Sequence, residues 1–422
     1  MPSTAKDGSF WHSEAYDVAG FTELSGAHPF EGLPVPTLMF MAIYLDNAAT
    51  SHPKPEAVYR AVDHALRHLT NPGRGGHSLS LDASREVFEA REAVAEFFGI
   101  GDAGRVAFTG GATAALNCAL FGLLRPGDRV VTSTMEHNSV VRPLRVLQDR
   151  GVRVVKVAAD ALGFIDPERL KAACAEERTR LVVLSHCSNV TGTRQPIEEI
   201  GPWCRKEGIL LLVDAAQSAG HFHIDVERMG IDLLAAPGHK GLLGPQGIGF
   251  LYVREGVRID PLLFGGTGTE SAQELPPETM PERLESGTLN LPGIAGLRAG
   301  IVFLKKEGAQ LHAGEAALLE RLIEGLRPIA GLRLYGPLDP AVHCGALSFN
   351  LIGRDPAEVG FLLDRDHGVL ARVGLHCAPD AHRTIGTFPR GTVRLSPGCF
   401  TTAEEIDHAI AAVAAIATRP PA

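Results

Sequence analysis

The chain has 422 residues and a formal net charge of −9, with 45% hydrophobic and 21% charged residues. This composition is ordinary for a soluble globular protein, and the length predicts one large and one smaller domain. The negative charge and the scattered basic residues give no electrostatic reason to expect nucleic acid or an anionic membrane surface as a partner. No apolar run approaches the length of a membrane-spanning helix.

Seven cysteines are spaced irregularly without any Cys-x-x-Cys pair, at positions 118, 174, 187, 204, 344, 377 and 399. An odd number with this spacing argues against a disulfide framework and against a zinc ribbon, so no metal site is expected. The N-terminus shows no basic segment leading into an apolar core. We therefore expect no secretory signal and a cytoplasmic location.

Residues 1–40 mix glycine, proline, serine and isolated aromatic residues, which predicts an N-terminal extension with little regular structure. Residues 41–60 form a further N-terminal segment, in which a short strand at 43–45 breaks into a turn at 46–50. A helix is expected over 56–68, because prolines lie just before its first turn. After a loop at 71–77, a second helix is expected, capped by Asp82 and ended by Gly99.

The next unit combines a strand at 105–108, the turn Thr-Gly-Gly-Ala-Thr at 109–113, and a helix at 114–124. Glycines and a hydroxyl at the start of a helix can hold a phosphate on backbone N–H groups, at the positive end of the helix dipole. An ordinary strand–helix turn capped by Thr113 explains the same residues. The motif alone does not decide between these two interpretations.

Strands and helices then alternate, with strands expected at 129–131, 152–157, 181–184, 209–213, 233–236 and 249–253. This alternation predicts a mainly parallel sheet that is covered on both faces. Polar residues follow three of the strands, at 136–138, at 188–189, and at Asp214 with Gln217. Such residues are usually turn residues, but their repetition at successive strand ends predicts one shared crevice.

The stretch 209–240 organises the rest of the chain. Its first apolar run ends at Asp214, and a second apolar run leads into the turn Pro-Gly-His-Lys that ends at Lys240. A lysine on a tight turn and a carboxylate on a neighbouring strand end are the two charges that pyridoxal phosphate requires. The lysine binds the cofactor covalently, and the carboxylate keeps the ring nitrogen protonated. Taken singly, such an aspartate is more often a cap, and such a lysine is more often solvated.

A glycine-rich segment at 265–269 and a turn at 285–290 precede a helix that we expect from Gly293 toward Lys306. This helix marks the passage from a large domain, 61–300, to a small C-terminal domain, 301–422. The small domain alternates helices with short strands at 347–351, 369–372 and 392–395, as α+β domains do.

In order and spacing, these segments resemble the fold-type I pyridoxal phosphate enzymes of aminotransferase class V, in particular the cysteine desulfurases and selenocysteine lyases. The resemblance runs from about residue 43 to 416. It rests on YLDNAATS at 44–51, TGGATAALN at 109–117, EHNS at 136–139, SNVTGT at 188–193, VDAAQSAGH at 213–221, GHKGLLGPQGIG at 238–249, ESGTLN at 285–290, RVGLHCAP at 372–379 and TVRLS at 392–396. It implies an α/β fold, with a mainly parallel seven-stranded sheet in the large domain and a smaller α+β C-terminal domain that carries the catalytic cysteine loop.

The resemblance also implies roles for single residues. Lys240 binds pyridoxal phosphate and moves the substrate Cα proton, Asp214 pairs with the pyridine nitrogen, and His137 stacks on the ring. Other cofactor contacts are implied for Gln217 at the phenolic oxygen, for Gly111, Ala112, Thr113 and His239 at the phosphate, for Asn189, and for Thr288 from the second subunit of a homodimer. Substrate contacts are implied for Arg394 and Asn189, which hold the carboxylate, with Arg372 on the matching arginine before the catalytic loop.

The implied reaction converts L-cysteine to L-alanine and leaves the sulfur on Cys377 as a persulfide, which a sulfur-acceptor protein could then collect. The polar loop 374–379 around Cys377 favours an exposed, reactive thiol, and the neighbouring His376 could assist it. The plainer interpretation is an incidental buried cysteine, as we assume for Cys118, Cys174 and Cys187.

Three departures from the family pattern are Pro237, Ala114 and Thr401, where serine or threonine, an acidic residue and asparagine are usual. They indicate a divergent branch, and the phosphate site would then lean on Thr113, His239 and Thr288. One alternative function is a selenocysteine or cystine lyase, an epimerase or a transaminase, none of which needs a nucleophilic thiol. Another is a sulfur-transfer scaffold without a cofactor, against which Lys240, Asp214 and Arg394 argue.

Overall fold

The computed structural model describes residues 42–73 and 76–419. The extension expected over residues 1–40 lies outside the described residues. By their contacts, the described residues from 42 to 419 form one compact unit. The boundaries expected near residues 60 and 300 within this unit stay predictions.

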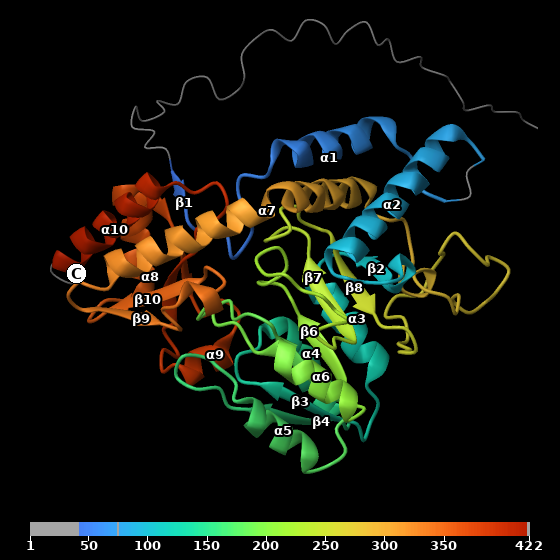
Figure 1. The fold of residues 1–422 in the computed structure, drawn as a ribbon, viewed down its shortest axis with the longest axis horizontal. Helices are drawn as coiled ribbons and strands as arrows, with labels where there is room; N and C mark the ends of the chain where they lie inside the picture. The colour runs from blue at the N-terminus through green and yellow to red at the C-terminus, as the bar shows by residue number, and fades with distance from the viewer. Residues whose placement is uncertain (1–41, 74–75, 420–422) are drawn as a thin grey trace, which may run out of the picture. The chain divides into compact units, whose positions relative to one another are not determined.

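A seven-stranded sheet runs through the described chain in the order β2-β8-β7-β6-β5-β3-β4 (Figure 1). Neighbouring strands are parallel except at β8, which is antiparallel to both β2 and β7. The strands are β2 (Val106–Thr109), β3 (Arg129–Ser133), β4 (Arg153–Val157), β5 (Leu181–Ser185), β6 (Leu210–Asp214), β7 (Leu233–Pro237) and β8 (Gly249–Val253). The mainly parallel sheet is confirmed, with strand ends that differ from the expected ones by at most two residues.

Helices precede and connect these strands. They are α1 (Glu56–His68), α2 (Ser78–Phe97), α3 (Ala112–Leu123), α4 (Asn138–Asp149), α5 (Pro167–Ala175) and α6 (Ile197–Lys206). The expected cap of the second helix was wrong. The helix begins at Ser78 because Nδ1 of His77 accepts a hydrogen bond from the Ser80 N–H at 3.2 Å, which leaves Asp82 inside the helix. Histidine is not among the usual N-cap residues, so its role went unrecognised.

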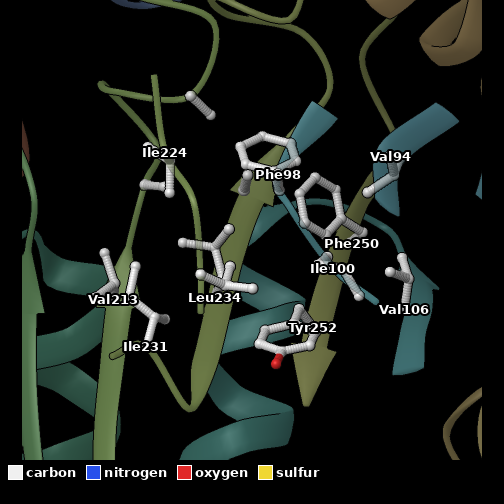
Figure 2. Packing of buried hydrophobic residues seen from close by; sticks show 14 of the residues in the cluster. Val94, Phe98, Ile100, Val106, Val213, Ile224, Ile231, Leu234, Phe250 and Tyr252 are labelled. Atoms are coloured by element: carbon white, nitrogen blue, oxygen red, sulfur yellow. The ribbon is translucent and has the colours of Figure 1, made fainter. Parts of the chain in front are cut away.

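Alternate side chains of the central strands point to opposite faces of the sheet, and both faces are buried. Leu211 and Val213 of β6 pack among residues of α2, α5 and α6, whereas Leu212 packs among residues of α3 and α4. Figure 2 shows part of the first face, where the rings of Phe98 and Phe250 lie 5.2 Å apart between centroids. Burial on both faces explains why these strands read as continuous apolar runs and not as alternating ones.

The long helix α7 (Leu291–Leu326) has 36 residues and extends well past the expected end near Lys306. It packs against α1, α2 and α10 (Ala403–Thr418) (Figure 1). These contacts stabilise it as one helix although it contains several glycines. A Cβ at Gly325 would lie 2.3 Å from the Ile410 side chain of α10, so this glycine permits the close approach of the two helices. Tertiary packing overrides the local signals that suggested an earlier end.

The C-terminal part holds an antiparallel four-stranded sheet in the order β12-β13-β10-β9, with its own hydrophobic core. Its elements are β9 (Leu332–Tyr335), β10 (Leu347–Leu351), α8 (Pro356–His367), β12 (Arg372–Gly374), α9 (Pro379–Thr384) and β13 (Thr392–Leu395). The strand expected at 369–372 is two strands, since β11 (Val369–Leu370) pairs separately with β1 (Ile43–Tyr44). The smaller α+β part is thereby confirmed.

Three short 3₁₀ helices complete the secondary structure of the described residues, at Ala103–Arg105, Glu282–Leu284 and Pro340–Val342. Within residues 42–73 and 76–419, no helix is both long and apolar enough to cross a membrane.

Candidate active site

A cavity of about 340 Å³ lies at the carboxyl ends of β3, β5, β6 and β7, where the sequence predicts a shared crevice. The predicted site residues that line it are Gly111, Ala112, Thr113, His137, Asn189, Asp214, Gln217, His239 and Lys240. The structure thus brings together most of the predicted cofactor residues from five separate segments. Arg372, Arg394, Cys377 and Thr288 are not among the lining residues.

One end of the cavity is formed by the start of α3. Gly111 is the N-cap residue at a φ of 132°, and it offers no side chain to the free N–H groups of the first turn. A Cβ on Gly249 of β8 would lie 2.7 Å from the Cα of Gly111, so glycine lets the turn pack against the sheet. Free N–H groups at a helix N-terminus form an anion site. The Nδ1 atom of His239 is also buried there without a partner among the described residues.

The two central charges of the cavity are Lys240, on the turn after β7, and Asp214, the last residue of β6. Burial lowers the pKa of Lys240 to about 8, against an opposing effect of the Asp214 carboxylate. Burial raises the pKa of Asp214, whereas the N–H of Ala216, 2.9 Å from Oδ1, and the charge of Lys240 lower it. A buried lysine with a lowered pKa is neutral near pH 8 more often than an ordinary lysine is, and the neutral amine is the nucleophilic form.

His137 is the N-cap residue of α4 and is linked through Ser139 to Thr113 at the start of α3. Its Nδ1 accepts a hydrogen bond from the Ser139 N–H at 3.1 Å, which leaves the proton of a neutral ring on Nε2. The Ser139 hydroxyl lies 2.9 Å from that Nδ1 and 2.8 Å from the Thr113 hydroxyl. Burial, aided by the charge of Lys240, lowers the pKa of His137 to about 4, so the ring is neutral at physiological pH.

Gln217 lines the cavity from the turn after β6, and its Nε2 donates a hydrogen bond to the Ala48 carbonyl at 3.0 Å. This contact ties the N-terminal segment to the site. The sequence does not predict this hydrogen bond, because no local pattern links two residues that are 169 positions apart.

The same N-terminal segment also holds the backbone of the turn that carries Lys240. The carbonyl of His239 accepts hydrogen bonds from the Ser51 N–H at 3.0 Å, from the Thr50 hydroxyl at 3.1 Å and from Lys54 Nζ at 2.8 Å. The Ser51 hydroxyl lies 3.2 Å from that carbonyl and 3.0 Å from the carbonyl of Lys240. Thr50, Ser51 and Lys54 thus form a clamp on the turn that carries Lys240. The sequence alone predicts no role for these residues.

A second missed residue is Glu136, which is fully buried directly under the cavity. Its carboxylate accepts hydrogen bonds from the Ser133 hydroxyl at 2.5 Å and from both the N–H and the hydroxyl of Ser185 at 2.8 Å. Ser185 lines the cavity and pairs with Asp214 in the sheet. Burial raises the pKa of Glu136 to about 7 despite these donors. Glu136 belongs to the EHNS motif at 136–139, but the sequence predicts a role only for its neighbour His137.

Arg394 of β13 is buried beside the cavity and already has protein partners. Its Nη1 donates to the Asn189 carbonyl at 3.0 Å and its Nη2 to Asp46 Oδ1 at 2.7 Å, while its Nε is buried without a partner within the described residues. Arg372 is half-exposed and lies 3.6 Å from the other oxygen of Asp46. Asp46 therefore pairs with both arginines where the sequence predicts a substrate carboxylate, and its single negative charge offsets one of their two positive charges.

The loop that carries Cys377 adjoins the cavity but is built differently. His376 and Cys377 have φ values of 47° and 59°, in the left-handed region that costs residues with a side chain about 1–2 kcal/mol each. Hydrogen bonds from residues that follow two strands of the large sheet offset this strain. The Asn138 N–H donates to the Cys377 carbonyl at 2.8 Å, and Asn189 Nδ2 donates to the His376 carbonyl at 2.6 Å.

This loop conformation separates the two neighbouring side chains. Cys377 is exposed, whereas the His376 ring is buried with its Nε2 3.0 Å from the Thr392 hydroxyl. Burial, with the charge of Arg394, lowers the pKa of His376 to about 2. His376 therefore supports the loop and is not a base for Cys377, contrary to the assistance that the sequence suggested.

Thr288 is exposed and lies at the rim of two outer hollows, near residues 266–268 and near Leu263. It contributes nothing to the cavity of its own chain, so a role at a phosphate requires a second subunit. That role stays a prediction.

Residues 43–409 match the aminotransferase class V family, and the chain belongs to it. Within that family it groups with the cysteine desulfurases. A probable cysteine desulfurase of Methanothermobacter thermautotrophicus is 40% identical over 372 residues, which cover 86% of this chain and 92% of that protein. One from Pyrococcus abyssi is 37% identical, with the same coverage. The apo structure of the cysteine desulfurase of Thermococcus onnurineus NA1 superposes with a TM-score of 0.82 at 34% identity, covering 89% of this chain and 95% of the other.

The family is dependent on pyridoxal phosphate, and the cavity fits that cofactor. The start of α3 offers free N–H groups for a phosphate, and Nδ1 of His239 in the same cavity has no partner among the described residues. The cavity also holds Lys240 and a buried carboxylate. Pro237 lines the same cavity and cannot donate a hydrogen bond, so the phosphate end relies on the remaining donors.

Proposed function

We propose that the protein is a cysteine desulfurase that converts L-cysteine to L-alanine and passes the sulfur to Cys377. The reaction is balanced with the enzyme thiol as second reactant: L-cysteine and the Cys377 thiol give L-alanine and a Cys377 persulfide. The carbon–sulfur bond of the substrate breaks and a sulfur–sulfur bond forms. The substrate carbon is reduced, and the two sulfurs together are oxidised by two electrons.

The bound cofactor supplies an electron sink for the substrate carbon. The protein residues do the rest. Asp214 would pair with the ring nitrogen of the cofactor and keep it protonated, and the neutral His137 would pack on the ring. Lys240 removes the proton from the substrate Cα and can return one. Arg394 exchanges Asp46 for the substrate carboxylate, since a guanidinium binds a carboxylate through two parallel hydrogen bonds.

The exposure and fixed position of Cys377 carry the proposal. Its carbonyl is bonded to the N–H of Asn138, the residue next to His137, so the loop is anchored at the edge of the cavity. Among the described residues it is the exposed cysteine, while the other six are buried or partly buried. An elimination or transamination would need no thiol at this position.

We further propose a homodimer in which Thr288 reaches the partner's phosphate site, and a cytoplasmic sulfur-acceptor protein that comes to Cys377. The exposure of Thr288 and of nearby Leu263 and Phe264 supports a covered face there, because large exposed apolar side chains mark interaction surfaces. Because the Cys377 loop is short and hydrogen-bonded, we expect the acceptor protein to bind next to Cys377 and the thiol to move little during sulfur transfer.

The test is a Cys377→Ala variant assayed for alanine formation from L-cysteine, with Cys399→Ala as a matched cysteine control. We expect the Cys377 variant to retain the visible absorbance of the cofactor, since its contacts lie elsewhere, and to lose alanine formation. Persulfide should be found on Cys377 by mass spectrometry of the unmodified protein. Full activity of the variant on L-selenocysteine or L-cystine as well as L-cysteine would assign a lyase instead.

A further inference from the structure

Two other cysteines, Cys187 and Cys344, meet behind the cofactor cavity although 157 positions separate them in the chain. They pack in one small buried cluster with Ala346, and each side chain shifts the pKa of the other. The backbone fixes the contact, because the Cys344 N–H donates to the Gly192 carbonyl at 2.9 Å. The Cys344 sulfur also lies 3.7 Å from the carbonyl of Ser188, the residue after Cys187.

The pair lies between two cavities. Cys187 lines the cofactor cavity, and Cys344 lines a second cavity of about 310 Å³. The second cavity also exposes His221, whose Nδ1 is 3.1 Å from a carboxylate oxygen of Glu315. Although burial opposes protonation, Glu315 and Cys344 raise the pKa of His221. A positive imidazole near a thiol favours the thiolate, which is the reactive form.

The two thiols differ in the way that a reactive and a resolving cysteine differ. The contact with Cys187, followed by the charge of His221, lowers the pKa of Cys344 against its burial. Burial, together with the contact to Cys344, raises the pKa of Cys187 well above the ordinary value. Cys344 is therefore the thiol that reacts first, and Cys187 is the neighbour that completes a disulfide.

We propose that Cys187 and Cys344 are a redox-active dithiol that a small hydroperoxide, entering through the second cavity, converts to a disulfide. The Cys344 sulfur attacks the peroxide oxygen, the O–O bond breaks, and a sulfenic acid and one water (or alcohol) form. The Cys187 sulfur then displaces hydroxide from the sulfenic sulfur, which leaves as a second water. The two thiols lose two electrons and two protons in total, and the peroxide gains both.

The disulfide would act on the neighbouring site, because Cys187 is two residues from Asn189. Asn189 holds the Cys377 loop through its side chain and Arg394 through its carbonyl. A covalent bond at Cys187 restrains or displaces this segment, so oxidation is expected to lower the turnover of the proposed reaction reversibly. The redox site itself does not depend on that reaction.

The experiment uses the cofactor-loaded Cys377→Ala protein, so that the exposed thiol cannot interfere, treated with a small excess of hydrogen peroxide. Free thiols are then blocked with an alkylating reagent, and the unreduced digest is mapped by mass spectrometry. We expect a linked pair of peptides carrying Cys187 and Cys344, two hydrogens lighter than the sum of the free peptides. The link should vanish after treatment with a dithiol reductant.

Two controls make the result specific. A Cys344→Ser variant should form no such link, and Cys118→Ser should form it as the parent does. Cys174 and Cys204 are also neighbouring buried cysteines, but neither lines the second cavity, so they should stay reduced. Oxidation of Cys174 with Cys204 at the same rate, or peroxide consumption that leaves both Cys187 and Cys344 alkylated, would overturn the proposal.

Discussion

The cofactor cavity and the Cys377 loop are neighbours built on opposite principles. The cavity takes its charged groups from the ends of central strands, whose side chains are buried on both faces. The loop exposes its thiol and has two successive residues in the left-handed region, and a few hydrogen bonds stabilise this conformation. The cofactor site is therefore fixed by the global fold, whereas the proposed sulfur transfer to Cys377 depends on local contacts that single substitutions can remove.

The largest effect is expected from breaking the cavity at its centre. A Lys240→Ala variant should lose both covalent cofactor attachment and proton transfer at the substrate Cα, which predicts a rate loss of more than about 10³-fold. Borohydride reduction of the parent protein should place the pyridoxyl group on Lys240, as shown by peptide mapping. A label on Lys54, the clamp lysine nearby, would contradict the assignment, and Lys306→Ala is the exposed control.

The second prediction concerns the floor of the cavity and its dependence on pH. Burial raises the pKa of Glu136 from 4.5 to about 7, so the folded state binds this proton more tightly than the unfolded chain does. The stabilising contribution is then complete below pH 4.5 and is lost as the pH rises through about 7. The difference corresponds to no more than about 3 kcal/mol.

A Glu136→Gln variant cannot titrate, so its free energy of unfolding should fall less between pH 5.5 and pH 8 than that of the parent. Denaturant unfolding at the two pH values measures this change. Glu324→Gln, on an exposed part of α7, should leave the parent's pH dependence unaltered. Equal pH dependence in the parent and in Glu136→Gln would mean that the carboxyl does not titrate in this range.

The third prediction breaks the link between the two regions. Asn189→Ala removes the side-chain donor to the His376 carbonyl and leaves a strained loop with one fewer support. Since a hydrogen bond to a buried carbonyl contributes about 1–2 kcal/mol, alanine formation should fall roughly tenfold while the cofactor spectrum persists. Alkylation of Cys377 should also change in rate, because the thiol becomes less confined.

Asn350→Ala is the matched control for this variant. Asn350 Nδ2 donates to the Gly391 carbonyl at 3.1 Å within the smaller sheet, so its loss removes a comparable bond far from Asn189 in the chain. An unchanged alkylation rate in Asn189→Ala, together with a raised KM alone, would assign Asn189 to the substrate carboxylate and not to the loop.

The sequence predicts the parts of the site that depend on the sheet. Strand ends and their polar residues follow from apolar runs and turn signals, so His137, Asp214 and Lys240 come together as expected. What the sequence does not predict depends on contacts between distant segments. The clamp of Thr50, Ser51 and Lys54 on the His239 carbonyl and the pairing of Asp46 with Arg394 have no local signature. The length of α7 was missed for the same reason, because its partners α1, α2 and α10 stabilise it.

The smallest effect is expected at the clamp, which joins the turn that carries Lys240 to the N-terminal segment. Lys54 Nζ donates to the His239 carbonyl at 2.8 Å and to the Ser51 hydroxyl at 2.7 Å, and burial lowers its pKa to about 8. In Lys54→Met, the carbonyl keeps its bonds from Thr50 and Ser51, so it is not left unpaired. Since the remaining donors limit the loss, the free energy of unfolding should fall by less than about 1 kcal/mol. The rate of cofactor release, followed by the loss of visible absorbance, should rise only a few-fold, and Lys306→Met should leave it unchanged. A loss as large as that of Lys240→Ala would show that the clamp, and not the sheet, fixes the position of the catalytic lysine.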